Sequence, residues 1–369
     1  MDVEEVEEMV KSSRDPEELR VRMQRWLAER LPEGADPHVG DVSSPSSTGM
    51  SSETLLFDAE WTEDGTRASH SFAVRVAPEG ADVPVFREYD LEKQFRAIRL
   101  VGEHSTVPVP RTRWLETDAA ALGAPFFVMD RVDGRVPPDI MPYPFGSWLK
   151  EASREDQRAL QDATVGVLVG LHGIDVSAVD VDFLELERTE ATALQRQFGD
   201  WRDYQLWVSD GRHFPVIEDG YQWLQENLPQ GEDEAVISWG DARIGNILYD
   251  GFRPAAVLDW EMVGLGPRGL DAGWCIFLHD FFEDLATMAG IDGMPHFMRR
   301  EDVEEEYEKR SGVRLRDLHW YETFAAWRHA AVMARIHSRR VHFEGAEWPE
   351  AIDDVVPHKA MLLRMIGAT

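Results

Sequence analysis

The chain has 369 residues, of which 43% are hydrophobic, enough apolar side chains for one large core or two medium ones. Its 38 Lys and Arg residues stand against 69 Asp and Glu residues, which gives a formal net charge of -31. A surface this acidic repels phosphate groups, so nucleic acid and anionic membranes are excluded as main partners.

The N-terminal sequence lacks the features of an export signal. Met1 to Val10 carry acidic side chains where a secretory signal needs positive charge followed by an apolar core. No window of the sequence reaches the roughly 20 apolar residues of a membrane span. The single cysteine, Cys275, cannot form a disulfide within the chain, which fits a reducing compartment. We therefore expect a cytoplasmic protein.

The sequence predicts three segments: a helical extension over residues 1–35, a small domain over residues 36–132 and a larger, mostly helical domain over residues 133–369. In the first segment, apolar side chains recur at helical spacing over residues 16–31. This helix is expected to end before Pro32 and to pack on the small domain.

The small domain opens with a predicted β-hairpin. Residues 43–53 are mainly small and lead into a strand over residues 54–61, where apolar side chains alternate. Asp64-Gly65 predicts the turn. The return strand covers residues 71–76, on which Arg75 points away from the apolar face.

Helical spacing returns over residues 88–102, which end before an extended Val-Pro-Val-Pro stretch. Two strand-like runs follow. The second covers residues 125–132 and ends at Asp133-Gly134, where we place the crossing between the domains. A buried helix is expected over residues 155–172. Most of the remaining chain is predicted to be helical, except residues 236–260.

The most informative segment is a second predicted hairpin. Apolar runs over residues 246–249 and 255–258 flank turn residues 250–254. Asn246 and Asp259 are equidistant from the turn centre, so strand pairing would place them side by side at the open end. Two oxygen-bearing side chains held there are suitable ligands for a hard cation such as Mg²⁺.

Asp241 lies five residues before Asn246, in a loop with the small neighbours Gly240 and Gly245. Its carboxylate can face the same metal region, where it would orient a substrate hydroxyl and accept its proton. The alternative is ordinary turn chemistry, since Asp-Gly and Gly-Asn pairs occur in plain connections. The joint spacing of Asp241, Asn246 and Asp259 favours the functional interpretation.

The pattern Asp-x-x-x-x-Asn, followed by a hairpin and a second Asp, resembles the catalytic and metal-binding loops of the protein-kinase-like superfamily. Trp239-Gly-Asp241 and Leu258-Asp-Trp-Glu261 are similar to the aminoglycoside phosphotransferase and choline kinase branch, in particular to its actinobacterial members. The resemblance covers residues 40 to 340. It implies a bilobal α+β fold, with a small nucleotide-binding N-lobe built from an antiparallel sheet plus a helix, and a larger, mostly helical C-lobe.

The resemblance also assigns roles to single residues. Asp241 matches the catalytic Asp, and Arg243 matches the cation beside the transferred phosphate. Asn246 and Asp259 match the metal ligands, which Glu261 is expected to join. The phosphate-covering loop has small residues that let backbone N–H groups approach phosphate. The resemblance thus implies three sets of nucleotide-binding residues. The phosphate-covering loop contributes Ser47, Thr48, Gly49, Ser51 and Ser52, the phosphate-binding strand contributes Arg75, and the hinge beside adenine contributes Met129, Asp130 and Val132.

Three positions depart from the family pattern. No lysine lies between Lys11 and Lys93, so Arg75 is the substitute for the phosphate-binding Lys, with the same charge and a different geometry. Gln94 stands where the partner Glu of that Lys is expected. Trp239 replaces the usual His, which removes a local hydrogen-bonding group. The catalytic and metal-binding positions are all filled, so an active enzyme is expected.

Four further features receive structural interpretations. His172 is expected to make a structural contact at a helix end, and Asp271 to cap a helix. Trp320, Phe324 and Trp327 recur at helical spacing and are predicted to lie in the core. The acidic run over residues 301–308 is predicted to be a solvated helix face.

The sequence thus predicts an ATP- and Mg²⁺-dependent phosphotransferase that moves the γ-phosphate to a hydroxyl group of a small molecule, without an obligate protein partner. The resemblance leaves ATP or GTP as the nucleotide. It leaves aminoglycosides, choline-like amines, sugars, amino acids and hydroxyacyl compounds as acceptors. The alternative is a nucleotide-binding pseudokinase with a regulatory or scaffolding role, which the missing Lys, Gln94 and Trp239 would suit.

Overall fold

The computed structural model describes residues 15–44, 53–78, 83–231 and 234–368. The chain divides into two compact units. Unit 1 comprises Met1–Gly102 and Pro110–Val132, and unit 2 comprises Glu103–Val109 and Asp133–Thr369. None of the described helices combines the length and apolar character needed to cross a membrane.

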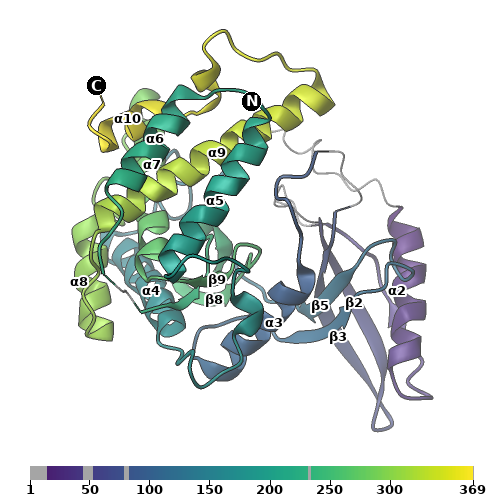
Figure 1. Cartoon of the computed structure of the whole chain (residues 1–369). Helices are drawn as coiled ribbons and strands as arrows, with labels where there is room; N and C mark the ends of the chain where they lie inside the picture. Colours follow the sequence, from purple (N-terminus) through teal and green to yellow (C-terminus); the bar gives the residue numbers. More distant parts are fainter. Residues whose placement is uncertain (1–14, 45–52, 79–82, 232–233, 369) are drawn as a thin grey trace. The chain divides into compact units, whose positions relative to one another are not determined.

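Unit 1 contains a five-stranded sheet in the order β1-β2-β3-β5-β4, in which every neighbouring pair is antiparallel (Figure 1). The long β2–β3 hairpin turns at Asp64-Gly65, as predicted, and both turn residues have positive φ. Both strands extend beyond their predicted ends. The strands are β1 (His38–Val39), β2 (Glu53–Glu63), β3 (Thr66–Val76), β4 (Thr112–Glu116) and β5 (Phe126–Asp130).

Two helices cover opposite faces of this sheet. The apolar side of α2 (Pro16–Arg30) packs with Phe126 and the other inward residues in one buried cluster. Phe95 of α3 (Leu91–His104) contacts Phe127, with ring centroids 6.0 Å apart. Because successive strand residues point to opposite faces, Phe126 and Phe127 assign the two helices to different sides. The helix predicted from residue 88 begins at Leu91, because the Asp90 carboxylate accepts from the N–H of Lys93 at 2.8 Å and caps it.

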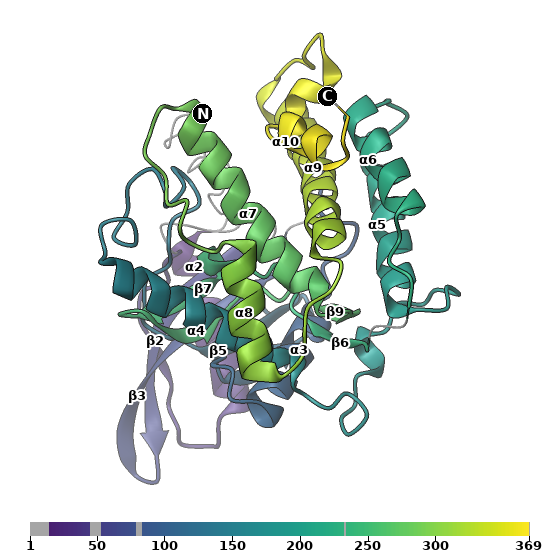
Figure 2. The same cartoon turned by 90° about the vertical axis from the view of Figure 1, so that its left-hand side faces the viewer.

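Unit 2 is mostly helical (Figure 2). Its α-helices are α4 (Arg154–His172), α5 (Ala193–Ser209), α6 (Pro215–Glu226), α7 (Gly269–Met288), α8 (Arg300–Ser311), α9 (Leu318–Glu344) and α10 (Lys359–Met365). The 3-10 helices are η1 (Asp182–Leu184), η2 (Ile244–Asn246) and η3 (Ile352–Val355). Two small antiparallel pairs join β6 (Val236–Ser238) to β9 (Gly264–Gly266) and β7 (Ile247–Asp250) to β8 (Arg253–Val257).

Helix α9 lies at the centre of the core of unit 2. Trp320, Phe324 and Trp327 are buried, as predicted. All three rings contact Phe198 of α5, at centroid distances of 5.8 to 6.0 Å. These aromatic side chains therefore serve packing between helices.

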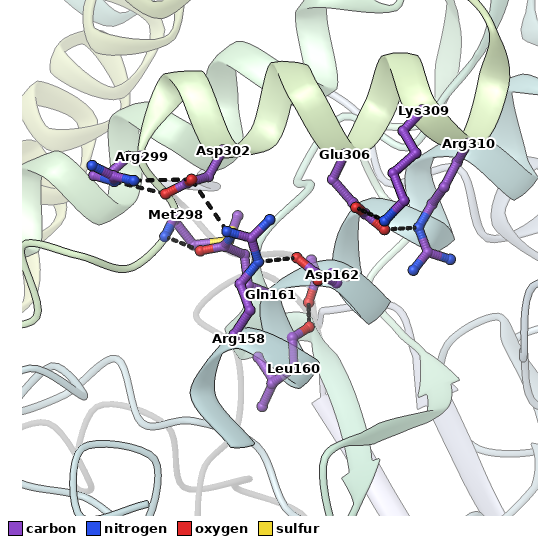
Figure 3. A network of polar contacts seen from close by, with 11 residues as sticks. Arg158, Leu160, Gln161, Asp162, Met298, Arg299, Asp302, Glu306, Lys309 and Arg310 are labelled. Carbon is purple, nitrogen blue, oxygen red and sulfur yellow. Dashed lines mark hydrogen bonds and ion pairs between the residues drawn. The ribbon is translucent and has the colours of Figure 1, made fainter. Parts of the chain in front are cut away.

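Helix α8 is attached to α4 by a polar network (Figure 3). Asp302 accepts from Arg158 at 3.2 Å and from Arg299 at 2.6 Å. Glu306 accepts from Lys309 and Arg310. The prediction of a uniformly solvated acidic face is wrong at Asp302 and Glu306, which are buried. Asp302 is paired with Arg158 of α4, whereas the partners of Glu306 lie on α8 itself, and in both cases the cations offset the charge of the buried carboxylate.

Candidate active site

The predicted catalytic residues lie in one loop of unit 2, which joins β6 to β7. Gly240 in this loop has a φ of 89°, and a Cβ added there would lie 2.2 Å from the carbonyl oxygen of Met262. Only glycine combines this left-handed backbone with so close an approach. Gly240 therefore lets the loop pass directly against the segment that follows Asp259.

Asp241 follows this glycine, and only 13% of its side chain is exposed. Its Oδ1 accepts from Nε1 of Trp274 at 2.7 Å, and its Oδ2 accepts from Nδ2 of Asn246 at 2.6 Å. The Nε of Arg243 donates to Oδ2 at 3.0 Å. Burial, and after it the neighbouring Asp259 carboxylate, raises the pKa of Asp241 to about 7. A positioned carboxylate with a pKa near neutrality is suited to proton transfer.

The predicted register of the second hairpin is wrong by one residue. Asn246 ends η2, and its carbonyl accepts from the N–H of Leu258 at 2.8 Å, so Leu258 lies opposite Asn246 and Asp259 lies one residue further along the chain. The turn is centred between Gly251 and Phe252, one residue earlier than predicted, and a bulge after Leu248 restores part of the offset. Asn246 and Asp259 still both adjoin Asp241, through a hydrogen bond and through an electrostatic interaction respectively.

Asp259 adopts a left-handed backbone with a φ of 58°, which costs a residue other than glycine about 1 kcal/mol. The indole of Trp239 donates to the carbonyl of Leu258 at 2.9 Å and to that of Asp259 at 3.1 Å. The expectation that Trp239 removes a local hydrogen-bonding group is therefore wrong, because Nε1 supplies one. The bond fixes the backbone of Asp259 against the loop that carries Asp241.

Asp271 of α7 anchors the same loop. Its carboxylate accepts from Oγ of Ser238 at 2.7 Å and from the backbone N–H groups of Trp239 at 2.8 Å and Gly240 at 2.9 Å. Burial alone would raise the pKa of Asp271, but the bond from His172 at 2.9 Å and the loop donors hold it below its usual value. The predicted helix cap is wrong, since these bonds go to the loop. His172 has the structural role that was expected.

Sequence reasoning missed Asp139, which is 104 residues from Arg243 along the chain. Its carboxylate forms an ion pair with Nη1 of Arg243. A Cβ at Gly245 would lie 2.4 Å from Oδ2 of Asp139, so glycine leaves room for this pair. Burial lowers the pKa of Arg243, against the opposing effect of the carboxylates of Asp259 and Glu261. The guanidinium of Arg243 thus interacts with the carboxylates of Asp139, Asp241, Asp259 and Glu261.

The oxygen-bearing side chains around Asp241 fit a hard divalent cation. Asn246 and Asp259 carry side-chain oxygens and interact with Asp241, and the carboxylate of Glu261 acts on Arg243. Within the described ranges, no three His, Cys, Asp or Glu side chains converge as a metal site. Mg²⁺ needs only one or two protein carboxylates, because phosphate and water complete its shell. The carboxylates here outnumber the cations, and a divalent cation would offset the remaining negative charge.

The predicted phosphate-binding residues lie in unit 1. Arg75 lies on β3 opposite Thr54 of β2, and its Nη1 donates to Oγ1 of Thr54 at 3.1 Å. Gln94, at the position expected for the partner of the family Lys, is buried in α3. Five residues of the predicted phosphate-covering loop lie outside the described residues: Ser47, Thr48, Gly49, Ser51 and Ser52.

The predicted hinge follows β5 in unit 1. Met129 is buried within the strand. The N–H of Asp130 donates to the carbonyl of Arg111 at 2.9 Å, and its carboxylate accepts from Arg113 at 2.6 and 2.9 Å. Val132 comes after these strand contacts and is the last residue of unit 1.

A model of the phosphotransferase enzyme family matches residues 57–294, a span that includes Asp241, Arg243, Asn246, Asp259 and Glu261. Among curated proteins, the chain is similar to "Probable acyl-CoA dehydrogenase IBR3" of Arabidopsis thaliana, with 27% identity over 271 residues. This match covers 68% of the chain and 31% of the relative. The chain thus spans about a third of that relative's length.

Two solved structures have the same fold. A "putative aminoglycoside phosphotransferase" from Ralstonia eutropha is 22% identical, with a TM-score of 0.64 and coverage of 94% of this chain and 96% of that one. A thermostable mutant of aminoglycoside phosphotransferase APH(4)-Ia with ADP and hygromycin B is 13% identical, with a TM-score of 0.55 and coverage of 94% and 98%. The predicted kinase-like α+β fold class is confirmed.

Proposed function

The chain belongs to the phosphotransferase enzyme family, and on this premise we propose that it transfers the γ-phosphate of ATP to a hydroxyl group of a small molecule, with Mg²⁺ as cofactor. The observation that carries the proposal is the hydrogen-bonded cluster of Asp241, Arg243 and Asn246 beside Asp259. This cluster brings a proton acceptor, side-chain oxygens that could bind a metal ion, and a cation together from the β6–β7 loop and the segment after β8, and these are the groups that phosphoryl transfer requires.

Asp241 is the catalytic residue in this proposal. Its carboxylate accepts the proton of the acceptor hydroxyl as the hydroxyl oxygen bonds to the γ-phosphorus. The bond from the γ-phosphorus to the β–γ bridging oxygen breaks, and ADP leaves with that oxygen. The guanidinium of Arg243, held by Asp139 and Asp241, offsets charge on the transferred group.

Asn246 and Asp259 would hold Mg²⁺, with Glu261 beside them. When bound, the ion neutralises phosphate charge. In unit 1, we assign Arg75 to phosphate binding, and we assign the backbone of Met129, Asp130 and Val132, chiefly Val132, to adenine. The ADP complex of a structurally similar protein supports an adenine nucleotide over GTP.

We propose a hydroxyacyl compound as the acceptor. The acyl-CoA dehydrogenase relative is 27% identical to this chain, whereas the hygromycin-bound structure is 13% identical, so the first is the nearer guide to the substrate. The buried, free Cys275 supports a reducing cytoplasm as the place of the reaction.

The test is ADP release from Mg²⁺-ATP against hydroxyacyl thioesters, aminoglycosides, choline-like amines and sugars. Asp241→Asn should abolish acceptor-dependent release. Asp250→Asn, the same change at the exposed last residue of β7, should leave it intact. Equal turnover by wild type and Asp241→Asn would refute the assignment of Asp241. Saturable ATP binding without turnover on any acceptor would favour the pseudokinase alternative.

A further inference from the structure

The indole of Trp274 makes a contact that the proposed mechanism does not yet use. Trp274 lies on α7, is 4% exposed, and donates from Nε1 to Oδ1 of Asp241 at 2.7 Å. Asn246 donates to the other oxygen at 2.6 Å. The Nε of Arg243 also donates to both oxygens, at 3.2 and 3.0 Å. Because each oxygen has its own neutral donor besides this shared cation, the carboxylate cannot rotate about its χ2 without breaking a hydrogen bond to Trp274 or Asn246.

Arg328 of α9 packs against the indole ring of Trp274 in a cation–π contact. The Arg328 guanidinium lies 4.3 Å from the ring centroid of Trp201 and 4.5 Å from that of Trp274. Its Nη2 donates to the carbonyl of Gly240 at 3.2 Å. Arg328 is only 3% exposed. The same guanidinium therefore supports both the indole and the residue before Asp241.

This partner choice differs from that of other tryptophans in unit 2. The indoles of Trp148, Trp239, Trp260, Trp320 and Trp327 donate to backbone carbonyls. A carbonyl bond satisfies a buried N–H and fixes packing. The bond from Trp274 goes to the reacting carboxylate, so it acts on the orientation of that group.

We propose that Trp274 is a positioning residue for Asp241: its indole N–H, backed by Arg328, holds the carboxylate in the orientation that receives the proton of the acceptor hydroxyl. The inference rests on the proposed function, because it concerns the same carboxylate. Trp274 of α7 thus orients the carboxylate of Asp241, and the buried Arg328 acts on that carboxylate only through its contacts with Trp274 and Gly240.

The kinetic test compares Trp274→Phe with Trp327→Phe. Trp327 is likewise buried, and its Nε1 donates to the carbonyl of Ile217 at 2.9 Å, so its substitution removes a matched bond elsewhere. Trp274→Phe should lower kcat about 10- to 100-fold, the value of one hydrogen bond to a charged group. The KM for Mg²⁺-ATP should stay within about twofold, and Trp327→Phe should keep the wild-type kcat. A kcat for Trp274→Phe within about twofold of wild type would overturn the proposal.

A second readout does not depend on turnover. The indole N–H resonance that disappears in Trp274→Phe identifies Trp274 in a nitrogen–proton correlation spectrum. In Asp241→Asn, that resonance should shift while the Trp327 resonance stays in place. An unmoved Trp274 resonance would refute the contact. Retained turnover in Asp241→Asn would refute the proposed function and with it this role, whereas an inactive Asp241→Asn beside a fully active Trp274→Phe would refute the positioning role alone.

Discussion

Gly240 combines two constraints that can be separated by experiment. Its φ of 89° is unfavourable for other residues, and a Cβ would meet the Met262 carbonyl at 2.2 Å. Gly251 has a φ of 59° with open space around its Cβ position. We expect Gly251→Ala to cost about 1 kcal/mol and Gly240→Ala to cost at least about 2 kcal/mol more, because the latter adds a clash with backbone. Urea unfolding measures both, and equal costs would contradict the role given to the close approach.

Two buried histidines should make stability depend on pH. Burial lowers the pKa of His279 and of His358 from 6.5 to about 4. Below pH 6.5 the unfolded chain binds protons that the folded chain does not, so the free energy of unfolding should fall by about 1.4 kcal/mol per pH unit for each histidine until about pH 4. Urea unfolding between pH 7.5 and 4.5 should show a shallower slope in His279→Gln/His358→Gln. Identical slopes would show that these groups are not buried as neutral rings.

Local spacing is what made the central residues predictable. Asp241 and Asn246 are five positions apart in one loop, so their chemistry could be inferred from the sequence. Asp139 and Trp274 contact the same loop from distant parts of the chain. Asp139 lies 104 residues before its partner Arg243, and Trp274 lies 33 residues after its partner Asp241. No periodicity connects such positions, because tertiary packing alone brings them together.

At the scale of single elements, alternation and turn residues located both hairpins, and helical spacing located α2, α3 and α4 within a few residues. The register of β7 and β8 was not predictable in the same way. It depends on a bulge after Leu248, where one extra residue is accommodated without a marked change in residue type. The role of Asp271 was missed for a similar reason, since an acidic residue in the first turn of a helix usually serves that helix.

The packing of α7 on α9 depends on a glycine. A Cβ at Gly273 would lie 2.7 Å from the backbone of Tyr321, whereas a Cβ at Gly166 of α4 would meet only the flexible end of Arg310, at 3.1 Å. Gly273→Ala should therefore destabilise the protein by about 1–3 kcal/mol through overpacking. Gly166→Ala should be neutral or stabilise by up to about 1 kcal/mol through helix propensity. Thermal and urea unfolding compare the two, and a neutral Gly273→Ala would contradict the close helix contact.

For the whole molecule, the sequence indicated the fold class because it combines two patterns. The first part is strand-rich with one long hairpin, and the second part is helical except for the loop that carries Asp241 and the hairpin that follows it. The acceptor could not be inferred in the same way. The aromatic side chains of α9 that could have indicated a ligand are buried in the core of unit 2, against α5 and α6. Net charge describes the surface as a whole and says little about one site.

Phosphoryl transfer through Asp241 is tested by following the γ-phosphate itself. Wild type, Asp241→Asn and Asp250→Asn are incubated with Mg²⁺ and ATP labelled at the γ-phosphate, together with the acceptor that supports ADP release, and the label is traced. Wild type and Asp250→Asn should move the label into a phosphoester of the acceptor, and Asp241→Asn should leave it on ATP. Label transfer by Asp241→Asn at the wild-type rate would show that the Asp241 carboxylate takes no part in phosphoryl transfer.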